Sequence, residues 1–229
     1  AGALLYDITD PSAVERVTFV SNGSNGSVVI RDATAAKTLM LTSDFLVPSI
    51  SRASMDPIDL TTANYLILTN SHLRKPTGGG ADPVREYAAY RASSGGGGFD
   101  TLTVNVSTLF DQYNFGETSP LALYQFFRQV VDEGDVDYIF LIGKGMDANV
   151  NFHRIQLGYI EQELFGTTYR MRDLVPSAGM PGSDMYYTAG LAGQPHVPAI
   201  ATGRIPAVNA GQVLSYLNKV RSTESKPFE

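Results

Sequence analysis

The chain has 229 residues, of which 43% are hydrophobic and 17% are charged, so it can bury a substantial core and is not a disordered tail. Its net charge of -6, without a run of basic residues, argues against nucleic acid as a partner. The sequence holds no cysteine, which excludes disulfides, thiolate zinc sites and any thiol nucleophile within these residues.

The first sixty residues have the pattern of β structure. Two β-branched runs, 16–20 and 27–31, are joined by a segment with two Asn-Gly pairs, which accept the positive φ angles of hairpin turns. The sequence therefore predicts a hairpin here. Residues 37–42 are a further candidate strand, and the polar, Ser-rich stretch 48–57 then marks a boundary.

From residue 64 onward the pattern changes to strands that alternate with helices, which is typical of a parallel sheet covered on both faces. Helix starts are predicted where a capping residue precedes the apolar spacing, at Asp82, Ser119 and Asn209. A weakly helical stretch, 157–164, is expected within a long insertion before the fourth strand. The expected strands are 65–69, 101–106, 137–142 and 199–203.

We therefore predict an α/β fold: a parallel sheet of about four strands with helices on both faces, preceded by a small β-rich segment. The expected division is a β-rich segment over residues 1–58 and an α/β domain over 59–229.

Two residues are candidates for binding a small anion. Lys144 follows the third strand directly after Gly143, and Asn70 follows the first strand. Open α/β sheets usually place ligands at this carboxyl edge. The motif around Lys144 is not a phosphate-binding loop, so a tight turn with a solvated lysine is the simpler interpretation.

Metal binding has weaker support. Asp147, His153, Asp184 and His196 could together serve a metal hydrolase, but they lack a recognisable ligand spacing. We expect no cofactor beyond, at most, a structural calcium ion at Asp147 and Asp184, because carboxylates suit a hard cation.

A last motif, Gly203-Arg204-Ile205-Pro206, lies where the chain leaves the predicted fourth strand. Arg204 can pair with a carboxylate, and Pro206 ends the extended run before the final helix. A structural clamp is favoured over a catalytic arginine.

Several short motifs follow one another in a distinctive order: 65–70, 86–91, 103–106, 110–113, 139–143, 175–177, 182–184, 203–206 and 216–220. Their order resembles the amino-terminal half of the gingipain-type cysteine peptidase region. The resemblance is strongest to the version found in cell-surface sortases of the type IX secretion system, and it covers most of residues 60–226. The segment 5–11 also resembles the end of the β-rich domain that precedes the peptidase region in those sortases. One departure is Lys144, where many relatives carry Asp, and this weakens a carboxylate-based cation site.

The resemblance implies a caspase-like first subdomain whose catalytic Cys and His lie in a second subdomain, expected to begin where this chain stops. No catalytic residue of the family can therefore be placed in this chain, and we expect the fragment to be inert. Gly143, Arg204 and Pro206 would be structural residues at the edge that supports the missing subdomain.

The implied setting is the cell surface or outer membrane of a Bacteroidetes-type bacterium, facing outward, with secreted cargo proteins and other type IX secretion components as partners. The full-length protein would cleave carboxy-terminal secretion signals and attach the cargo to the cell surface. A stand-alone module that binds a small anion near Asn70 and Lys144 remains the alternative.

Overall fold

The structure, a computed structural model, describes residues 2–23, 25–30, 34–52, 55, 57–146, 159–164 and 167–226. The chain divides into two compact units, Ala1–Ala53 and Ser54–Glu229. This division lies five residues before the boundary expected from the sequence. No helix in the described part of the chain is both long and apolar enough to cross a bilayer.

The first unit consists of two small antiparallel sheets. β1 lies between β2 and β5 in one sheet, and β3 pairs with β4 in the other. The predicted hairpin is present, but the run 16–20 is divided between β2 and β3, which belong to different sheets. Residues expected in the connection, such as Asn22 and Asn25, pair with each other in the ladder, so the turn is tighter than predicted. The strands are β1 (Leu4–Asp7), β2 (Glu15–Val17), β3 (Phe19–Asn22), β4 (Asn25–Val28) and β5 (Leu39–Thr42).

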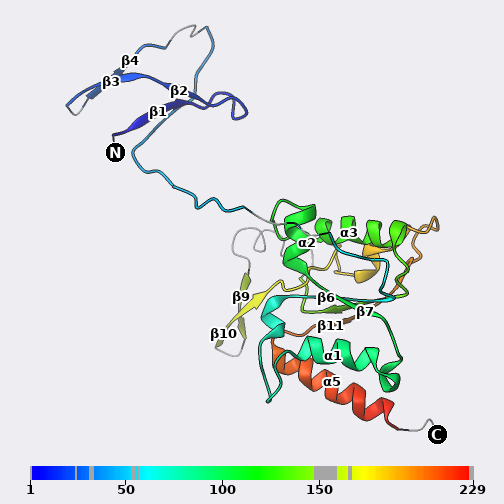
Figure 1. The fold of residues 1–229 in the computed structure, drawn as a ribbon. Helices are drawn as coiled ribbons and strands as arrows, with labels where there is room; N and C mark the ends of the chain where they lie inside the picture. The colour runs from blue at the N-terminus through cyan, green and yellow to red at the C-terminus, as the bar shows by residue number, and fades with distance from the viewer. Residues whose placement is uncertain are drawn as a thin grey trace. The chain divides into compact units, whose positions relative to one another are not determined.

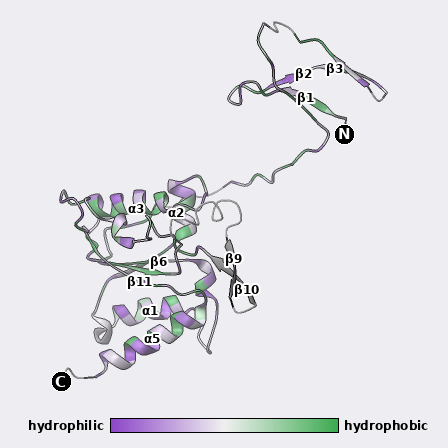
Figure 2. Ribbon diagram, turned by 180° about the vertical axis from the view of Figure 1, so that it is seen from behind, coloured by the Kyte–Doolittle hydropathy of each residue, from purple (hydrophilic) through white to green (hydrophobic). Residues whose placement is uncertain are grey.

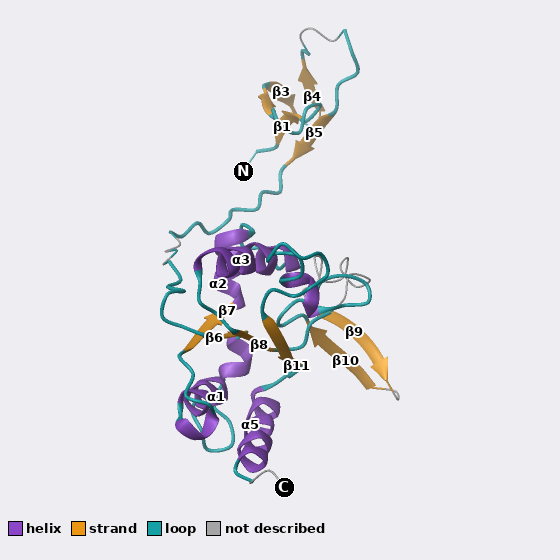
Figure 3. Cartoon of the chain, turned by 90° about the vertical axis from the view of Figure 1, so that its right-hand side faces the viewer, coloured by secondary structure: helices purple, strands orange, loops and turns teal. Residues whose placement is uncertain are grey.

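The second unit is a three-layer α/β structure, as predicted. Its four-stranded parallel sheet has the order β11-β8-β6-β7. Helices α2 and α3 cover one face, and α1 and α5 cover the other (Figures 1 and 3). The strands are β6 (Tyr65–Thr69), β7 (Thr101–Asn105), β8 (Tyr138–Ile142) and β11 (Ala201–Ile205), and the helices are α1 (Pro83–Ala92), α2 (Val106–Tyr113), α3 (Pro120–Glu133) and α5 (Ala210–Glu224).

The core lies on both faces of β6, whose five residues are all buried. Leu66 and Leu68 pack against α2 and α3, and Tyr65 and Ile67 pack against α1 and α5, because successive strand residues point to opposite faces. Purple and green alternate along the helices in Figure 2, as expected when one helix face is buried and the other is solvated.

The predicted helix starts are those of the structure. The side chains of Asp82, Ser119 and Asn209 each accept a hydrogen bond from a backbone amide in the first turn of α1, α3 and α5, respectively. Proline follows the cap in α1 and α3, where its missing N–H has no intrahelical partner to lose.

Three predictions were wrong in detail. The strand 101–106 ends at Asn105, because the Asn105 side chain accepts from the Ser107 amide and starts α2, a helix that was not predicted. The expected helix over 157–164 is instead β9 (Tyr159–Leu164), which pairs with β10 (Thr167–Arg172) in an antiparallel ladder. The fourth strand is displaced by two residues from the expected range 199–203, because pairing with β8 begins at Ala201 and continues to Ile205.

Candidate functional site at the carboxyl edge of the sheet

The carboxyl edge of the sheet is the place where open α/β folds usually bind ligands. The connection from β6 leads to β7 on one side, and the later strands β8 and β11 lie on the other side. The strand order therefore reverses between β6 and β8, and this is the point at which open α/β sheets form a binding crevice. Asn70 follows β6 there, and Gly143 and Lys144 follow β8.

Asn70 is engaged within the fold. Its Oδ1 accepts from the His72 amide at 3.0 Å and caps the short 3-10 helix η1 (Ser71–Arg74), and its Nδ2 donates to the Leu174 carbonyl at 3.3 Å. The side-chain amide therefore holds together two segments that are far apart in sequence. That arrangement is structural and offers little to an anion.

The main chain of Lys144 is also engaged. Its N–H donates to the Ala207 carbonyl at 2.9 Å, and its carbonyl accepts from Leu174 at 2.9 Å and Val175 at 3.2 Å. Leu174 and Val175 are buried. We call residues 173–177 the crossing segment, because they pass over the carboxyl edge beside β6 and β8.

The glycines of the Gly143-Lys144-Gly145 turn allow the crossing segment to approach this closely. Gly143 has φ +149°, and a Cβ there would lie 2.7 Å from Cγ2 of Val175. A Cβ at Gly145 would lie 2.4 Å from Oγ of Ser177 and 2.7 Å from the Val175 carbonyl oxygen. A side chain at either glycine would therefore collide with the crossing segment, which packs directly against this turn.

The Arg204 guanidinium holds the crossing segment in place through hydrogen bonds. Its Nε and Nη2 donate to the two carboxylate oxygens of Asp184, each at 2.7 Å. Nη1 donates to the carbonyls of Gly143 at 2.6 Å and Val175 at 2.7 Å, and Nη2 also donates to Pro176 at 3.1 Å. The guanidinium thereby uses its full set of N–H donors, and we call this arrangement of Arg204 with Asp184 and the three carbonyl groups the clamp.

The clamp joins four parts of the chain: β11, the turn after β8, the crossing segment and the residues that begin at Asp184. Asp184 begins the 3-10 helix η4 (Asp184–Tyr187), whose buried Tyr187 donates its hydroxyl to the Pro176 carbonyl at 2.6 Å. The side chains of Arg204 and Asp184 are only 12% and 22% exposed. Pro206 lies directly after β11 on the surface, and the chain turns there toward α5.

This geometry gives Asp184 a role other than metal binding. Both of its carboxylate oxygens face the Arg204 guanidinium, which competes with a cation for the same lone pairs. Asp147 and His153 lie outside the described residues, and His196 is exposed. Within the described ranges, no cluster of three or more His, Asp or Glu side chains could hold a metal ion.

Sequence reasoning missed the crossing segment as a structural part of the site. Its residues give no periodic signal, because they are fixed by contacts with Gly145 and Arg204 instead of by a regular element. The short motif 175–177, which carries part of the resemblance, was the available signal.

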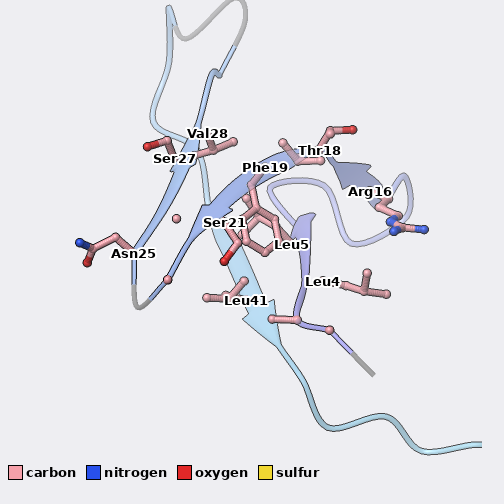
Figure 4. Close-up of a pocket in the computed structure, with 15 residues that line it drawn as sticks. Leu4, Leu5, Arg16, Thr18, Phe19, Ser21, Asn25, Ser27, Val28 and Leu41 are labelled. Atoms are coloured by element: carbon pink, nitrogen blue, oxygen red, sulfur yellow. The ribbon is translucent and has the colours of Figure 1, made fainter.

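A pocket lies within the first unit. It has a volume of about 850 Å³ and opens between the strands (Figure 4). Leu5, Phe19 and Leu41 gather in the middle of the view, whereas Arg16 and Asn25 point away from it. The lining mixes polar and apolar residues, and Arg16 is its single charged residue, so it contains no pair of groups suited to acid–base catalysis. The full lining is Gly2, Ala3, Leu4, Leu5, Arg16, Val17, Thr18, Phe19, Ser21, Gly23, Asn25, Gly26, Ser27, Val28 and Leu41.

Comparisons with known proteins place the α/β unit in a family. A search of the curated proteins found no match. A crystal structure of dimeric latent PorU from Porphyromonas gingivalis aligns with a TM-score of 0.45 and 14% identity. The alignment covers 95% of this chain and 22% of that chain, so the present residues span about a fifth of that protein. The model of peptidase family C25 matches residues 58–228, which include the sheet, its four helices and the Arg204 clamp, and the chain therefore belongs to peptidase family C25, the gingipain family.

Proposed function

We propose that this chain is the non-catalytic first subdomain of a gingipain-like cysteine peptidase region, and that it supports a second subdomain carrying the catalytic Cys and His. One observation carries the proposal: the family match extends over residues 58–228 in a sequence without a cysteine. A cysteine peptidase attacks the peptide carbonyl with a thiolate and forms a thioester, and no residue here can supply that sulfur.

The supporting role fits the geometry of the carboxyl edge. Arg204 and Asp184 hold the end of β8, the crossing segment and η4 in one rigid arrangement. Binding and catalytic groups need such rigid supports, because small displacements are costly to catalysis. The clamp is a positioning feature for the neighbouring subdomain and does not itself touch a substrate.

The finer proposal concerns the whole protein. We propose that it acts as a sortase of the type IX secretion system, which cleaves carboxy-terminal secretion signals and joins the cargo to a surface anchor. Its place would be the outer membrane, facing outward, with secreted cargo proteins and other secretion components as partners. The order of the family motifs within residues 60–226 supports this proposal.

The test compares the purified 229-residue chain with the natural polypeptide that contains it. Both are incubated with fluorogenic peptides and with a fluorescent peptidyl chloromethyl ketone, which alkylates an active thiolate. We expect neither turnover nor labelling of the chain alone, and labelling of one cysteine in the longer polypeptide. Turnover by the chain itself, with contaminating protease removed, would refute the subdomain role.

The sortase role needs a separate experiment in the source bacterium. Cells in which the gene is deleted should accumulate cargo that retains its carboxy-terminal signal, as read by mass spectrometry of the cargo. Complementation with the intact gene should restore cleavage and surface attachment, and complementation with a variant lacking the labelled cysteine should not. Normal cargo processing in the deletion strain would contradict the sortase role while leaving the family assignment intact.

A further inference from the structure

β11 is an open edge of the sheet. Within the described residues its strand neighbour is β8 alone. Gly143 donates its N–H to the Ile205 carbonyl at 2.9 Å, so Ile205 points toward β8. In a parallel pair successive residues point to opposite sides, and Thr202 and Arg204 therefore direct their backbone N–H and C=O groups away from the sheet. In the part of the chain that the structure describes, these outward groups have no hydrogen-bond partner.

The exposed residues along this edge have small side chains, and they carry no unpaired charge. Ala201 and Gly203 are exposed, and a Cβ built on Gly203 would make ordinary contact, at 3.5 Å, with the ring of Phe140 beneath it. The only charge on the strand, that of Arg204, is neutralised by Asp184 on the opposite face. Beside the strand, η4 presents Met185 and Tyr186, which are 54% and 56% exposed.

The edge lacks several of the features by which proteins protect an exposed strand. Within its five residues β11 has no proline and no lysine, and its ladder with β8 is regular. The opposite edge strand, β7, differs, because its residues are all partly or fully buried. An open edge of this kind can pair with another extended segment through its backbone groups.

We infer that the β11 edge receives a fifth strand, contributed by the catalytic subdomain of the same polypeptide. This inference rests on the proposed function, which supplies the partner. An uncharged, apolar surround is typical of permanent interfaces, whereas transient recognition of peptides relies more on polar and charged groups. The incoming strand hydrogen-bonds to Thr202 and Arg204 and places a large apolar side chain over Gly203, where it covers Phe140.

Amide hydrogen exchange tests the inference directly. The rates at Thr202 and Arg204 are measured, with residue resolution, in the natural polypeptide and in the separate 229-residue chain. We expect these two amides to exchange at least about 100-fold more slowly in the natural polypeptide, because strand pairing ties their exchange to opening of the interface. The inward amide of Gly203, which points toward β8, is the internal reference and should be protected in both.

A proline substitution gives an independent test with a matched control. Thr202→Pro removes an N–H that points away from the sheet, and it leaves the hydrogen bonds between β11 and β8 intact. Thr103→Pro is the control on the opposite edge: Tyr65 donates to the Asp100 carbonyl, and by the same alternation Thr103 points away from the sheet. In the natural polypeptide we expect Thr202→Pro to lower peptidase activity at least about tenfold and to expose the catalytic subdomain to proteolysis, with Thr103→Pro close to the wild type.

The outcomes separate the inference from the proposed function. Thiol-dependent peptidase activity with equally fast exchange of Thr202 and Arg204 in both proteins overturns the fifth strand and leaves the function standing. Absence of a thiol-dependent peptidase in the natural polypeptide overturns the function, and the inference with it. Protection that requires an added cargo peptide, or that rises with protein concentration, would assign the edge to a substrate or to a second copy, and either result overturns the inference.

Discussion

Arg204 connects more of this fold than any neighbouring side chain, because its guanidinium reaches a carboxylate and three carbonyl oxygens at once. Lysine cannot reproduce this fork, since its ammonium is a single point with three donors. We expect Arg204→Lys to lower the free energy of unfolding by about 2 kcal/mol and Arg204→Ala by about 3 to 5 kcal/mol, because the alanine leaves Asp184 partly buried and unpaired.

Urea unfolding followed by circular dichroism measures this difference. The matched control is Arg74→Lys, since Arg74 makes a single 2.8 Å contact with Asp82 and its side chain is 37% exposed. That change should cost less than about 1 kcal/mol. Equal losses for the lysine variants of Arg204 and Arg74 would show that the clamp is no stronger than a surface ion pair.

Substitution of Gly143 by alanine tests the contact between the Gly143-Lys144-Gly145 turn and the crossing segment. Alanine at this position meets two obstacles, a φ of +149° and a Cβ only 2.7 Å from the buried Val175 side chain. Gly190 isolates the first obstacle, because its φ is +80° and its Cβ position has no neighbour within 4 Å. We expect Gly143→Ala to cost about 1 to 3 kcal/mol more than Gly190→Ala, by the same unfolding measurement. If Gly190→Ala is at least as destabilising as Gly143→Ala, the crossing segment moves aside to accommodate the added methyl group.

At the scale of elements, α1 and α5 are joined by a polar network above an aromatic cluster. The hydroxyls of Tyr65 and Tyr87 lie 2.9 Å apart, and Arg91 donates to Tyr87 at 3.0 Å. Arg91 also pairs with Glu224 of α5 at 2.9 Å, and Tyr90 donates to the same carboxylate at 2.8 Å. The end of α5 is thereby fixed to α1, next to the stacked rings of Tyr87, Phe140 and Tyr216.

This network predicts a loss of stability in alkali. Burial, with the hydrogen bond from Tyr65, raises the pKa of Tyr87, and burial also raises the pKa of Tyr65. The fold therefore favours the neutral phenols, and their contribution is complete below the unfolded value near pH 10 and is lost as the pH rises above it. We expect Tyr87→Phe to cost about 1 kcal/mol at pH 7 and to flatten the fall in stability between pH 9 and 11. Tyr138→Phe, at a residue 43% exposed, removes a hydroxyl outside this network and should cost less than about 0.5 kcal/mol at pH 7.

The elements of the sheet could be predicted from the sequence because local signals and burial agree there. β6 is a short apolar run buried on both faces, and the caps at Asp82, Ser119 and Asn209 mark their helices unambiguously. α2 was missed because it follows β7 without a connecting loop, so Val106 reads as one more strand residue. β9 was misread because its regularity comes from pairing with β10, which local spacing does not encode.

The sequence predicts which residues lie at the carboxyl edge of the sheet, but it does not predict the contacts between them. The strand order places Asn70 and Lys144 at the reversal of the sheet, as parallel topology requires. That Asn70 holds the crossing segment and that Arg204 reaches Asp184 depends on contacts across 104 and 20 residues of sequence. Such contacts follow from packing and have no counterpart in motif spacing.

At the scale of the whole molecule, the two units differ in how much they bury. Leu5 is the one buried hydrophobic residue among the described residues of the first unit, and Leu41, Val20 and Leu46 there are largely exposed. The α/β unit buries two continuous clusters, one on each face of its sheet. Because hydrophobic burial is the main term that stabilises folded chains, the two units should differ widely in stability.

We therefore expect limited proteolysis to remove the first unit and to spare the second. Trypsin and thermolysin at low concentration should cut within residues 1–57 first and leave a fragment that begins near Ser54 and retains α1, α2, α3 and α5, as identified by mass spectrometry. The fragment should melt within a few degrees of the intact chain, because the unit that was lost contributes little buried area. Arg204→Ala is the informative companion, since loosening the crossing segment should open new cleavage sites between residues 173 and 187. First cuts inside the sheet of the intact chain, or a melting temperature that falls steeply on removal of the first unit, would show that the β-rich strands stabilise the peptidase subdomain.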